Sequence, residues 1–263
     1  MPQLPVVLTV AGSDNSCGAG AQADLKTITT LGGYAQTAIT CVVAEVPGQV
    51  ESIQAVKPAV VEAQIRLSIE AFPVAAIKTG MLFSPAIVKK VATTLKRLAA
   101  GVPLVVDPVM VASSGEPLLE PEAIEAYKQR LFPLATLLTP NLDELRILSD
   151  MPCGTIVQME QAARSLVENY GCSVLAKGGH LGTKQAVDIL VTREGSERFS
   201  APFRRGVDAH GTGCTFSAAI ATGLAQGLTL SEAVGRGKRF ITQAIEQRLT
   251  WGKTTALDHR VQV

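Results

Sequence analysis

The chain has 263 residues, of which 47% are hydrophobic, and this is enough apolar sequence to form one large core. The formal net charge is +1 and no basic block is present, so we expect neither a nucleic-acid-binding protein nor a membrane-surface protein. The five scattered cysteines, the absence of a charged leader before a long apolar segment, and the absence of apolar runs of ~18 residues favour a cytoplasmic protein that binds small molecules.

Short apolar, β-branched segments alternate with longer amphipathic segments along the chain. The apolar segments predict strands at 6–12, 37–45, 74–80, 103–109, 135–140 and 173–179, and a hairpin over 185–192 and 197–202. The amphipathic segments predict helices at 20–33, 58–72, 85–100, 121–131, 158–171, 213–227 and 231–248, and another that starts within 141–150.

Uncharged strands separated by helices are typical of a parallel sheet that is covered on both faces. Such a sheet binds ligands beyond the carboxyl ends of its strands, and the polar and glycine-rich segments of this chain fall at those ends. The chain contains no linker, internal repeat or low-complexity segment. We therefore predict an α/β fold with a single domain over residues 1–263.

The sequence HGTGC at 210–214 precedes a predicted helix. Gly211 and Gly213 allow successive backbone N–H groups around Thr212 to point into one concavity, and the helix amino terminus adds the positive end of its dipole. This arrangement suits a phosphate. The alternative interpretation is an ordinary loop in which Thr212 or Thr215 caps the helix.

Cys214 lies where the helix dipole should lower the pKa of a thiol. The resulting thiolate could accept a proton from a substrate hydroxyl. The alternative is a small buried hydrophobic residue, which is common for free cysteine. We interpret Cys41 and Cys172 as core residues, while Cys17 lies in a glycine-rich loop with no base nearby.

Charged residues near other strand ends also allow two interpretations. Asn141 and Glu144 are three residues apart at a helix start, which predicts a capping box, but Glu144 could also hold Mg²⁺ through water. Lys177 ends an apolar strand and could either bind a nucleotide phosphate or extend to solvent. We interpret His180 and His210 as hydrogen-bonded structural residues.

Two apparent nucleotide-binding motifs are weak. The sequence GAGAQA at 18–23 matches a dinucleotide fingerprint, but a long loop beginning at Gly12 separates it from its strand, which argues against a dinucleotide oxidoreductase. The sequence WGKTT at 251–255 is similar to the end of a Walker A motif, but Gln247 stands where the first glycine is required.

A set of short segments, none of them specific alone, occurs in an order that resembles one family. The segments are AGSD at 11–14, GAGAQADLKT at 18–27, IKTGM at 77–81, DPVM at 107–110, SGEPLL at 114–119, TPNLDE at 139–144, LAKGGH at 175–180 and HGTGCT at 210–215. Over roughly residues 5–250 the chain resembles the hydroxymethylpyrimidine/phosphomethylpyrimidine kinases of thiamine biosynthesis, in the ribokinase-like superfamily.

The resemblance implies a ribokinase-like three-layer α/β/α sandwich with a mostly parallel central sheet, and usually a homodimer. It implies transfer of the ATP γ-phosphate, with Mg²⁺ as cofactor, to the hydroxymethyl group of 4-amino-5-hydroxymethyl-2-methylpyrimidine. In many members the resulting monophosphate is then phosphorylated again.

Site residues carry over by position within the matching segments. Gly213, with Gly211 and Thr212, corresponds to the anion hole, and Cys214 to the catalytic base. Lys177 corresponds to the contact with ATP phosphate, and Asn141 with Glu144 to the phosphate and magnesium site. The residues that match the pyrimidine pocket are Gly12, Asp24, Met81 and Val109.

Glu45 stands where the family pattern A-Q-N-T-x-G-V has glutamine. Glutamine offers one donor and one acceptor to an aminopyrimidine edge, whereas an ionised glutamate offers acceptors only. Either burial keeps Glu45 protonated, or it faces a protonated or differently substituted heterocycle with two donors. The remaining alternative is that Glu45 points to solvent and another residue contacts the ring. We expect instead that Glu45 lines the pocket.

Further departures weaken the expectation of a second phosphorylation. Ser113 replaces an expected lysine, VDA at 207–209 replaces an Asn-Thr pair, and WGKTTALDH at 251–259 replaces a G-H-G-containing stretch. These departures are also compatible with a specialised kinase that acts on a related pyrimidine. A pyridoxal or pyridoxine kinase would keep the fold, but Met110 and Val111 stand where we would expect a second cysteine. A binding protein without turnover is disfavoured by the intact HGTGC, Lys177 and Glu144.

Overall fold

The computed structural model describes residues 4–110, 121–179, 181, 185–204 and 210–262. A nine-stranded sheet has the order β3-β2-β1-β4-β5-β6-β7-β8-β9. Its strands are β1 (Val6–Asp14), β2 (Tyr34–Val46), β3 (Gln49–Ala55), β4 (Val74–Thr79), β5 (Leu104–Val106), β6 (Leu137–Leu138), β7 (Ser173–Gly178), β8 (Gln185–Val191) and β9 (Ser196–Pro202).

Most of this sheet is parallel, as predicted. Strands β2, β1, β4, β5, β6 and β7 pair in parallel, since each crossover between them passes through a helix or a long connection. The two edges are antiparallel: β3 returns along β2, and the predicted hairpin forms β8 and β9. Strand β3 was not predicted, and a separate small hairpin joins β10 (Leu249–Trp251) to β11 (Thr254–Ala256).

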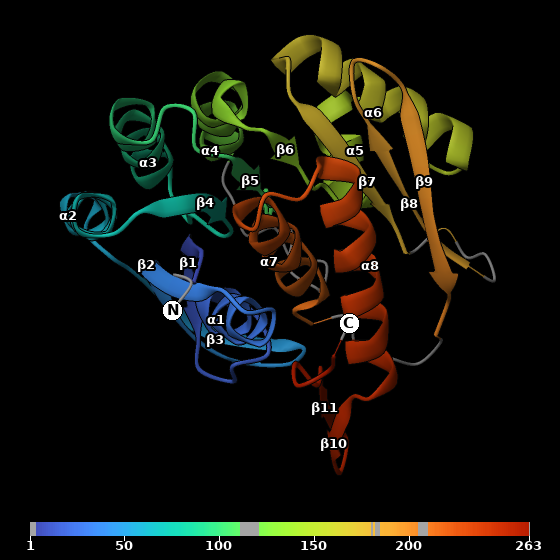
Figure 1. The fold of residues 1–263 in the computed structure, drawn as a ribbon, viewed down its shortest axis with the longest axis horizontal. Coiled ribbons are helices and arrows are strands. Elements are labelled where there is room, and N and C mark those ends of the chain that lie inside the picture. The colour runs from blue at the N-terminus through green and yellow to red at the C-terminus, as the bar shows by residue number, and fades with distance from the viewer. Residues whose placement is uncertain (1–3, 111–120, 180, 182–184, 205–209, 263) are drawn as a thin grey trace.

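Helices cover both faces of the sheet and produce three layers (Figure 1). Helices α1 (Gly20–Thr30), α7 (Thr212–Ala225) and α8 (Leu230–Glu246) lie on one face. The other face carries α2 (Pro58–Ala71), α3 (Pro85–Leu98), α4 (Pro121–Ala126), α5 (Leu142–Ser149) and α6 (Ile156–Tyr170). A π-helical turn, η1 (Tyr127–Leu131), and a 3₁₀ turn, η2 (Phe132–Leu134), follow α4.

Side-chain alternation explains why the strands are apolar on both faces. In β7, Val174 and Ala176 pack with the α2–α6 layer, whereas Leu175 packs with α7 and α8. Successive side chains of a strand point to opposite faces, so both neighbours of Leu175 must also be apolar. None of the helices in the described ranges is long and apolar enough to cross a membrane.

Two predicted strands are shorter in the structure because proline interrupts them. The segment 103–109 forms only β5, and 135–140 forms only β6. Pro108 and Pro140 lack the backbone N–H that a central strand must donate. Polar residues at these early strand ends, Asp107 and Thr139, are therefore placed at the carboxyl edge of the sheet.

Candidate active site

A cavity of about 590 Å³ opens at the carboxyl ends of the parallel strands. Its wall is built by the loop after β1, the end of β2, the segments after β5 and β7, the hairpin β8–β9, and helices α7 and α8. The predicted site residues that line it are Gly12, Glu45, Met81, Val109, Asn141, Glu144, Lys177, Gly211, Thr212, Gly213 and Cys214. Chain segments nearly 200 residues apart thus meet at one site, as expected for a sheet of this topology.

The loop after β1 is organised around the buried carboxylate of Asp14. This carboxylate accepts hydrogen bonds from the backbone N–H groups of Ser16 (2.7 Å), Gly18 (3.1 Å) and Ala19 (2.7 Å), and it lies 3.0 Å from Nε2 of His210. Burial alone would raise the pKa of Asp14, but the His210 contact and the other hydrogen bonds lower it to about 2. The glycine-rich loop is therefore shaped by an internal anion rather than by a dinucleotide.

Glu45 lies on the cavity wall near the end of β2, where the register with β3 shifts between Ala44 and Glu45. Its backbone N–H donates to Oδ1 of Asn15 at 2.7 Å, which ties the strand end to the loop after β1. Burial and the neighbouring charge of Asp14 raise the pKa of the Glu45 carboxyl, and His210 only partly offsets them. Glu45 therefore lines the cavity, as the sequence predicted, in surroundings that raise the pKa of its carboxyl.

The other residues on the wall that the sequence predicted for a pyrimidine pocket are held by tight backbone packing. A Cβ atom on Gly12 would lie 2.9 Å from Sγ of Cys41, so glycine is needed where β1 passes β2. Val109 has a φ of 33°, which is unusual for a β-branched residue and fixes the chain just after Pro108. Met81 follows β4, close to Gly12.

The first turn of α7 presents backbone N–H groups to the cavity. Gly211 has a φ of 78°, and a Cβ atom there would overlap the carbonyl oxygen of Gly18. The first intrahelical hydrogen bond runs from the N–H of Thr215 to the oxygen of Gly211 at 2.9 Å. The N–H groups of Gly213 and Cys214 precede this bond and have no acceptor within the helix. This is the geometry of an anion-binding site.

The prediction that the helix dipole lowers the pKa of Cys214 is wrong. Burial raises the pKa of this thiol to about 11. The ammonium of Lys78 opposes the rise, the carboxylates of Asp24 and Asp107 add to it, and the N–H of Gly20 at the start of α1 lowers it again. Loss of water around the thiol therefore outweighs the dipole, and Cys214 is a thiol at neutral pH in this structure.

Lys177 lies beside the α7 turn, paired with Asp107. Its Nζ atom is 2.8 Å from Oδ1 of Asp107, which also accepts from Oγ1 of Thr139 at 3.0 Å. A Cβ atom added to Gly213 would lie 3.1 Å from this Nζ atom. Burial opposes the charge of Lys177, but Asp107 and Glu144 outweigh it and raise the pKa of the lysine. Lys177 therefore stays charged and does not extend to solvent.

Asn141 and Glu144 form the predicted capping box at the start of α5. Oδ1 of Asn141 accepts from the N–H of Glu144 at 2.9 Å, and Oε2 of Glu144 accepts from the N–H of Asn141 at 2.8 Å. Oε1 of Glu144 accepts from the N–H of Met110 at 3.1 Å. Burial raises the pKa of Glu144 to about 7, although Lys177 and these amides favour its charged form. Both residues also line the cavity, so the cap does not exclude a binding role.

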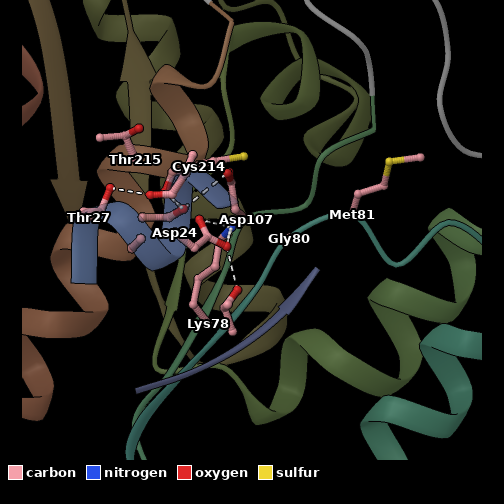
Figure 2. Close-up of polar contacts among 12 residues, drawn as sticks. Asp24, Thr27, Lys78, Gly80, Met81, Asp107, Cys214 and Thr215 are labelled. Carbon is pink, nitrogen blue, oxygen red and sulfur yellow. Dashed lines mark hydrogen bonds and ion pairs between the residues drawn. The ribbon is translucent and has the colours of Figure 1, made fainter. Parts of the chain in front are cut away.

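Asp24 is the predicted pocket residue that the structure places elsewhere. Its carboxylate lies behind the cavity wall, where Nζ of Lys78 contacts its oxygens at 2.8 and 2.9 Å (Figure 2). Oγ1 of Thr9 donates to the same carboxylate at 2.6 Å. The side chains of Asp24 and Lys78 are both fully buried. Asp24 faces away from the wall because it lies on the side of α1 that packs on the sheet.

Asp107, Asp188 and Lys238 are among the polar residues of the wall that were not predicted as site residues. Asp107 belongs to the DPVM segment, so its place at a strand end was a usable signal. Asp188 and Lys238 form a pair at 2.6 Å between β8 and α8, and the N–H of Gly178 donates to the other oxygen of Asp188 at 3.0 Å. A charged residue within the apolar strand 185–192 was the available signal for Asp188.

Other expectations from the sequence have mixed outcomes. Cys41 and Cys172 are buried, as expected, and Cys17 is partly exposed. The segment 251–259 forms the turn and second strand of the β10–β11 hairpin and leads to His259, whose Nε2 lies 2.9 Å from Oγ1 of Thr215. The expectations for Ser113, for the segments 114–119 and 207–209, and for His180 lie outside the described residues.

Comparison with known proteins identifies relatives across nearly the whole chain. The family model of phosphomethylpyrimidine kinase matches residues 14–257. The chain is 46% identical over 91% of its length to a thiamine biosynthesis bifunctional protein, ThiED, of Geobacter sulfurreducens, of which it covers 49%. It is 42% identical to the hydroxymethylpyrimidine/phosphomethylpyrimidine kinase of Escherichia coli, over 91% of this chain and 90% of that protein. The chain thus spans about half the length of some relatives and nearly all of others.

Solved structures of similar proteins show the same fold. A pyridoxal kinase of Bacillus subtilis in complex with ADP superimposes with a TM-score of 0.88 at 35% identity, over 98% of both chains. A phosphomethylpyrimidine kinase of Clostridium difficile gives a TM-score of 0.82 at 37% identity, over 92% of this chain and 100% of that chain. The ribokinase-like three-layer fold is therefore confirmed, and the chain belongs to the phosphomethylpyrimidine kinase family.

Proposed function

We propose that this protein is an ATP- and Mg²⁺-dependent kinase of thiamine biosynthesis or salvage. Its substrate is the hydroxymethyl group of 4-amino-5-hydroxymethyl-2-methylpyrimidine, and it also phosphorylates the resulting monophosphate. The observation that carries the proposal is one cavity that is lined by Lys177, the first turn of α7 and Cys214 together with Gly12 and Glu45. A single domain, a homodimer and a cytoplasmic location belong to the same proposal.

The α7 turn and Lys177 would stabilise the transferring phosphoryl group. In such a reaction the charge is spread over the phosphoryl oxygens, and fixed N–H donors and cations supply most of the catalysis. The N–H groups of Gly213 and Cys214 point from a helix amino terminus, with the Lys177 ammonium beside them. Asp107 holds this ammonium in place through the 2.8 Å contact.

Glu144 and Asn141 fit the requirements of a magnesium site. Mg²⁺ prefers oxygen ligands and usually keeps several of its waters, so it is often held through one or two carboxylates. Each Glu144 oxygen accepts one backbone N–H and keeps a further lone pair, and Glu144 is among the residues that line the cavity. When bound, the ion would supply positive charge to the phosphate oxygens. The protein holds Glu144 in one orientation through the α5 cap.

Cys214 would accept the proton of the substrate alcohol. Because its resting pKa is about 11, it does not act as a preformed strong base at neutral pH. A loose phosphoryl transfer transition state requires little deprotonation before the alcohol oxygen begins to bond phosphorus. The alcohol proton becomes acidic only at that stage, so a weakly populated thiolate suffices at this position.

Glu45 would form hydrogen bonds with the heterocyclic ring of the substrate. Burial raises the pKa of the Glu45 carboxyl, and in the neutral form this carboxyl would have one donor and one acceptor and thus imitate glutamine toward an aminopyrimidine edge. A pyridoxal kinase is the alternative, supported by the TM-score of 0.88 to such an enzyme. Against this alternative, a pyridoxal kinase should have a second cysteine after the DPV segment, and Met110 stands there. Met110 is buried, and its backbone N–H donates to Glu144.

The test is ADP release with ATP and Mg²⁺ and one of three acceptors: the aminopyrimidine alcohol, its monophosphate, or pyridoxal. We expect turnover with the first two. Turnover with the alcohol alone would indicate a salvage or specialised enzyme, and turnover only with pyridoxal would replace the proposal by its alternative. If the folded protein releases no ADP with any of the three acceptors, the proposal is refuted.

A further inference from the structure

A fully buried ion pair lies directly behind the reacting end of the cavity. Lys78, near the end of β4, and Asp24, on α1, have side chains with 0% exposure, and their contacts are 2.8 and 2.9 Å. Figure 2 shows the Lys78 side chain extending toward Asp24 and Asp107, with Cys214 on the neighbouring turn of α7. Neither Lys78 nor Asp24 lines the cavity itself.

The Lys78 ammonium is placed there by several independent features. A Cβ atom on Gly80 would lie 2.9 Å from Nζ of Lys78, so this glycine leaves room for the lysine to reach the end of β4. Oγ1 of Thr9 donates to Asp24 and fixes the carboxylate from β1. A pair buried this deeply contributes little net stability, because the cost of removing both charges from water offsets their attraction. Stability alone therefore does not explain why this pair lies next to Cys214.

Charged groups near Cys214 come from several of the elements that meet around the start of α7. Lys78 comes from β4, Asp24 from α1, Asp107 from the segment after β5, and Lys177 from β7. Lys78 acts on the thiol in the direction that favours its thiolate, and Asp24 acts in the opposite direction. Two lysines and two carboxylates thus lie near the thiol, and a Cys214 thiolate would add a negative charge to this cluster.

We propose that Lys78 is a positioning residue for the phosphoryl transfer, whose buried ammonium, held by Asp24, stabilises the Cys214 thiolate that receives the alcohol proton. In this step the substrate O–H bond breaks, its proton forms an S–H bond with Cys214, and the oxygen keeps the electron pair with which it attacks phosphorus. The inference rests on the proposed function for this step. The electrostatic effect on the thiol can be measured without any substrate.

The experiment measures the rate at which iodoacetamide alkylates Cys214 as a function of pH. The background is Cys17→Ser, because Cys17 is the other cysteine that is not buried. In Lys78→Met the thiolate loses its supporting cation, and we expect alkylation at pH 8 to become about tenfold slower. In Asp24→Asn the Lys78 ammonium loses the negative charge of its partner and acts more strongly on the thiolate. We therefore expect alkylation to become several-fold faster.

The opposite signs separate electrostatics from a structural role. If the Lys78–Asp24 pair were only structural, both substitutions would loosen the packing around Cys214. The rate of alkylation would then change in the same direction in both variants. The matched control is Asp188→Asn, which breaks another buried ion pair of the cavity, with Lys238, and should leave the alkylation profile unchanged. If Lys78→Met does not fold, Asp24→Asn decides alone: slower or unchanged alkylation overturns the proposal.

Kinase activity gives a second readout in the same variants. We expect the pH at which kcat rises to move upward in Lys78→Met and downward in Asp24→Asn, with KM for the pyrimidine nearly constant. An unmoved kcat profile, with shifted alkylation, would overturn the catalytic part of the inference. If the parent protein phosphorylates none of the three acceptors, the proposed function fails, while the alkylation result still reports on Lys78.

Discussion

The substitution Gly213→Ala tests whether the first turn of α7 is the phosphate site. A Cβ atom at this position would lie 3.1 Å from Nζ of Lys177 and 3.3 Å from Oδ2 of Asp107. Both contacts are tighter than normal packing, and the buried Lys177–Asp107 pair must move to relieve them. The methyl group would therefore displace the cation and narrow the space in front of the exposed N–H groups.

The expected cost is kinetic rather than structural. Loss of one well-placed donor to a developing anion lowers kcat by roughly 10²–10³-fold, which corresponds to about 3–4 kcal/mol. The free energy of unfolding should change by less than ~1 kcal/mol, because alanine is favoured over glycine within a helix and offsets the crowding. ADP release at saturating ATP and pyrimidine gives kcat, and urea unfolding gives the stability.

Gly235→Ala is the matched control for this substitution. Gly235 lies within α8, and the nearest atom to an added Cβ would be Cε1 of Phe199 at an ordinary 3.6 Å. This variant should keep its activity and gain about 0.5–1 kcal/mol of stability. If Gly213→Ala retains kcat within about threefold of the parent protein, the α7 turn is not the site of phosphoryl transfer.

Three further substitutions test other parts of the site. Cys214→Ala should lower turnover far more than it weakens ATP binding in a titration, and unchanged turnover would remove the proton-acceptor role. Glu45→Gln should lower KM for the ordinary aminopyrimidine, since glutamine presents a donor and an acceptor at any pH; an unaltered KM would place Glu45 outside substrate recognition. Burial lowers the pKa of His259 from 6.5 to about 4, so its neutral form stabilises the fold above pH 6.5, and this contribution of about 3 kcal/mol is lost as the pH falls through 4. Urea unfolding from pH 7 to pH 4 should show this loss in the parent protein but not in His259→Gln, and equal losses in both would contradict it.

The fold was predictable where burial dictates sequence. Strands that are covered on both faces must be apolar throughout, and this gave clear signals for β1, β4 and β7. Strand β3 lies at an edge, and none of its residues is fully buried, so its sequence QVESIQA carries almost no apolar pattern. The π-helical turn of η1 has no local signal at all, because it depends on how α4 meets the rest of the core.

The site was predictable where motifs lie at strand ends, and less so where distant side chains meet. Glycines and polar residues after the strands were placed correctly on the cavity wall. Asp24 was misplaced because nothing near it in the sequence shows that Lys78, 54 residues later, neutralises it inside the fold. The acidity of Cys214 was misjudged because a helix dipole can be inferred from sequence, whereas loss of water around a thiol cannot.

The position of α7 has a consequence for synthesis on the ribosome. This helix packs against β1, β4 and β5, and together with α1 and α8 it covers one apolar face of the sheet. A nascent chain that has emerged only as far as β9 can assemble the opposite layer, yet it leaves Val7, Val105 and Leu175 without their cover. Such a sheet face is prone to aggregation. This face of the sheet is therefore fully shielded from water only after the last two long helices have been synthesised.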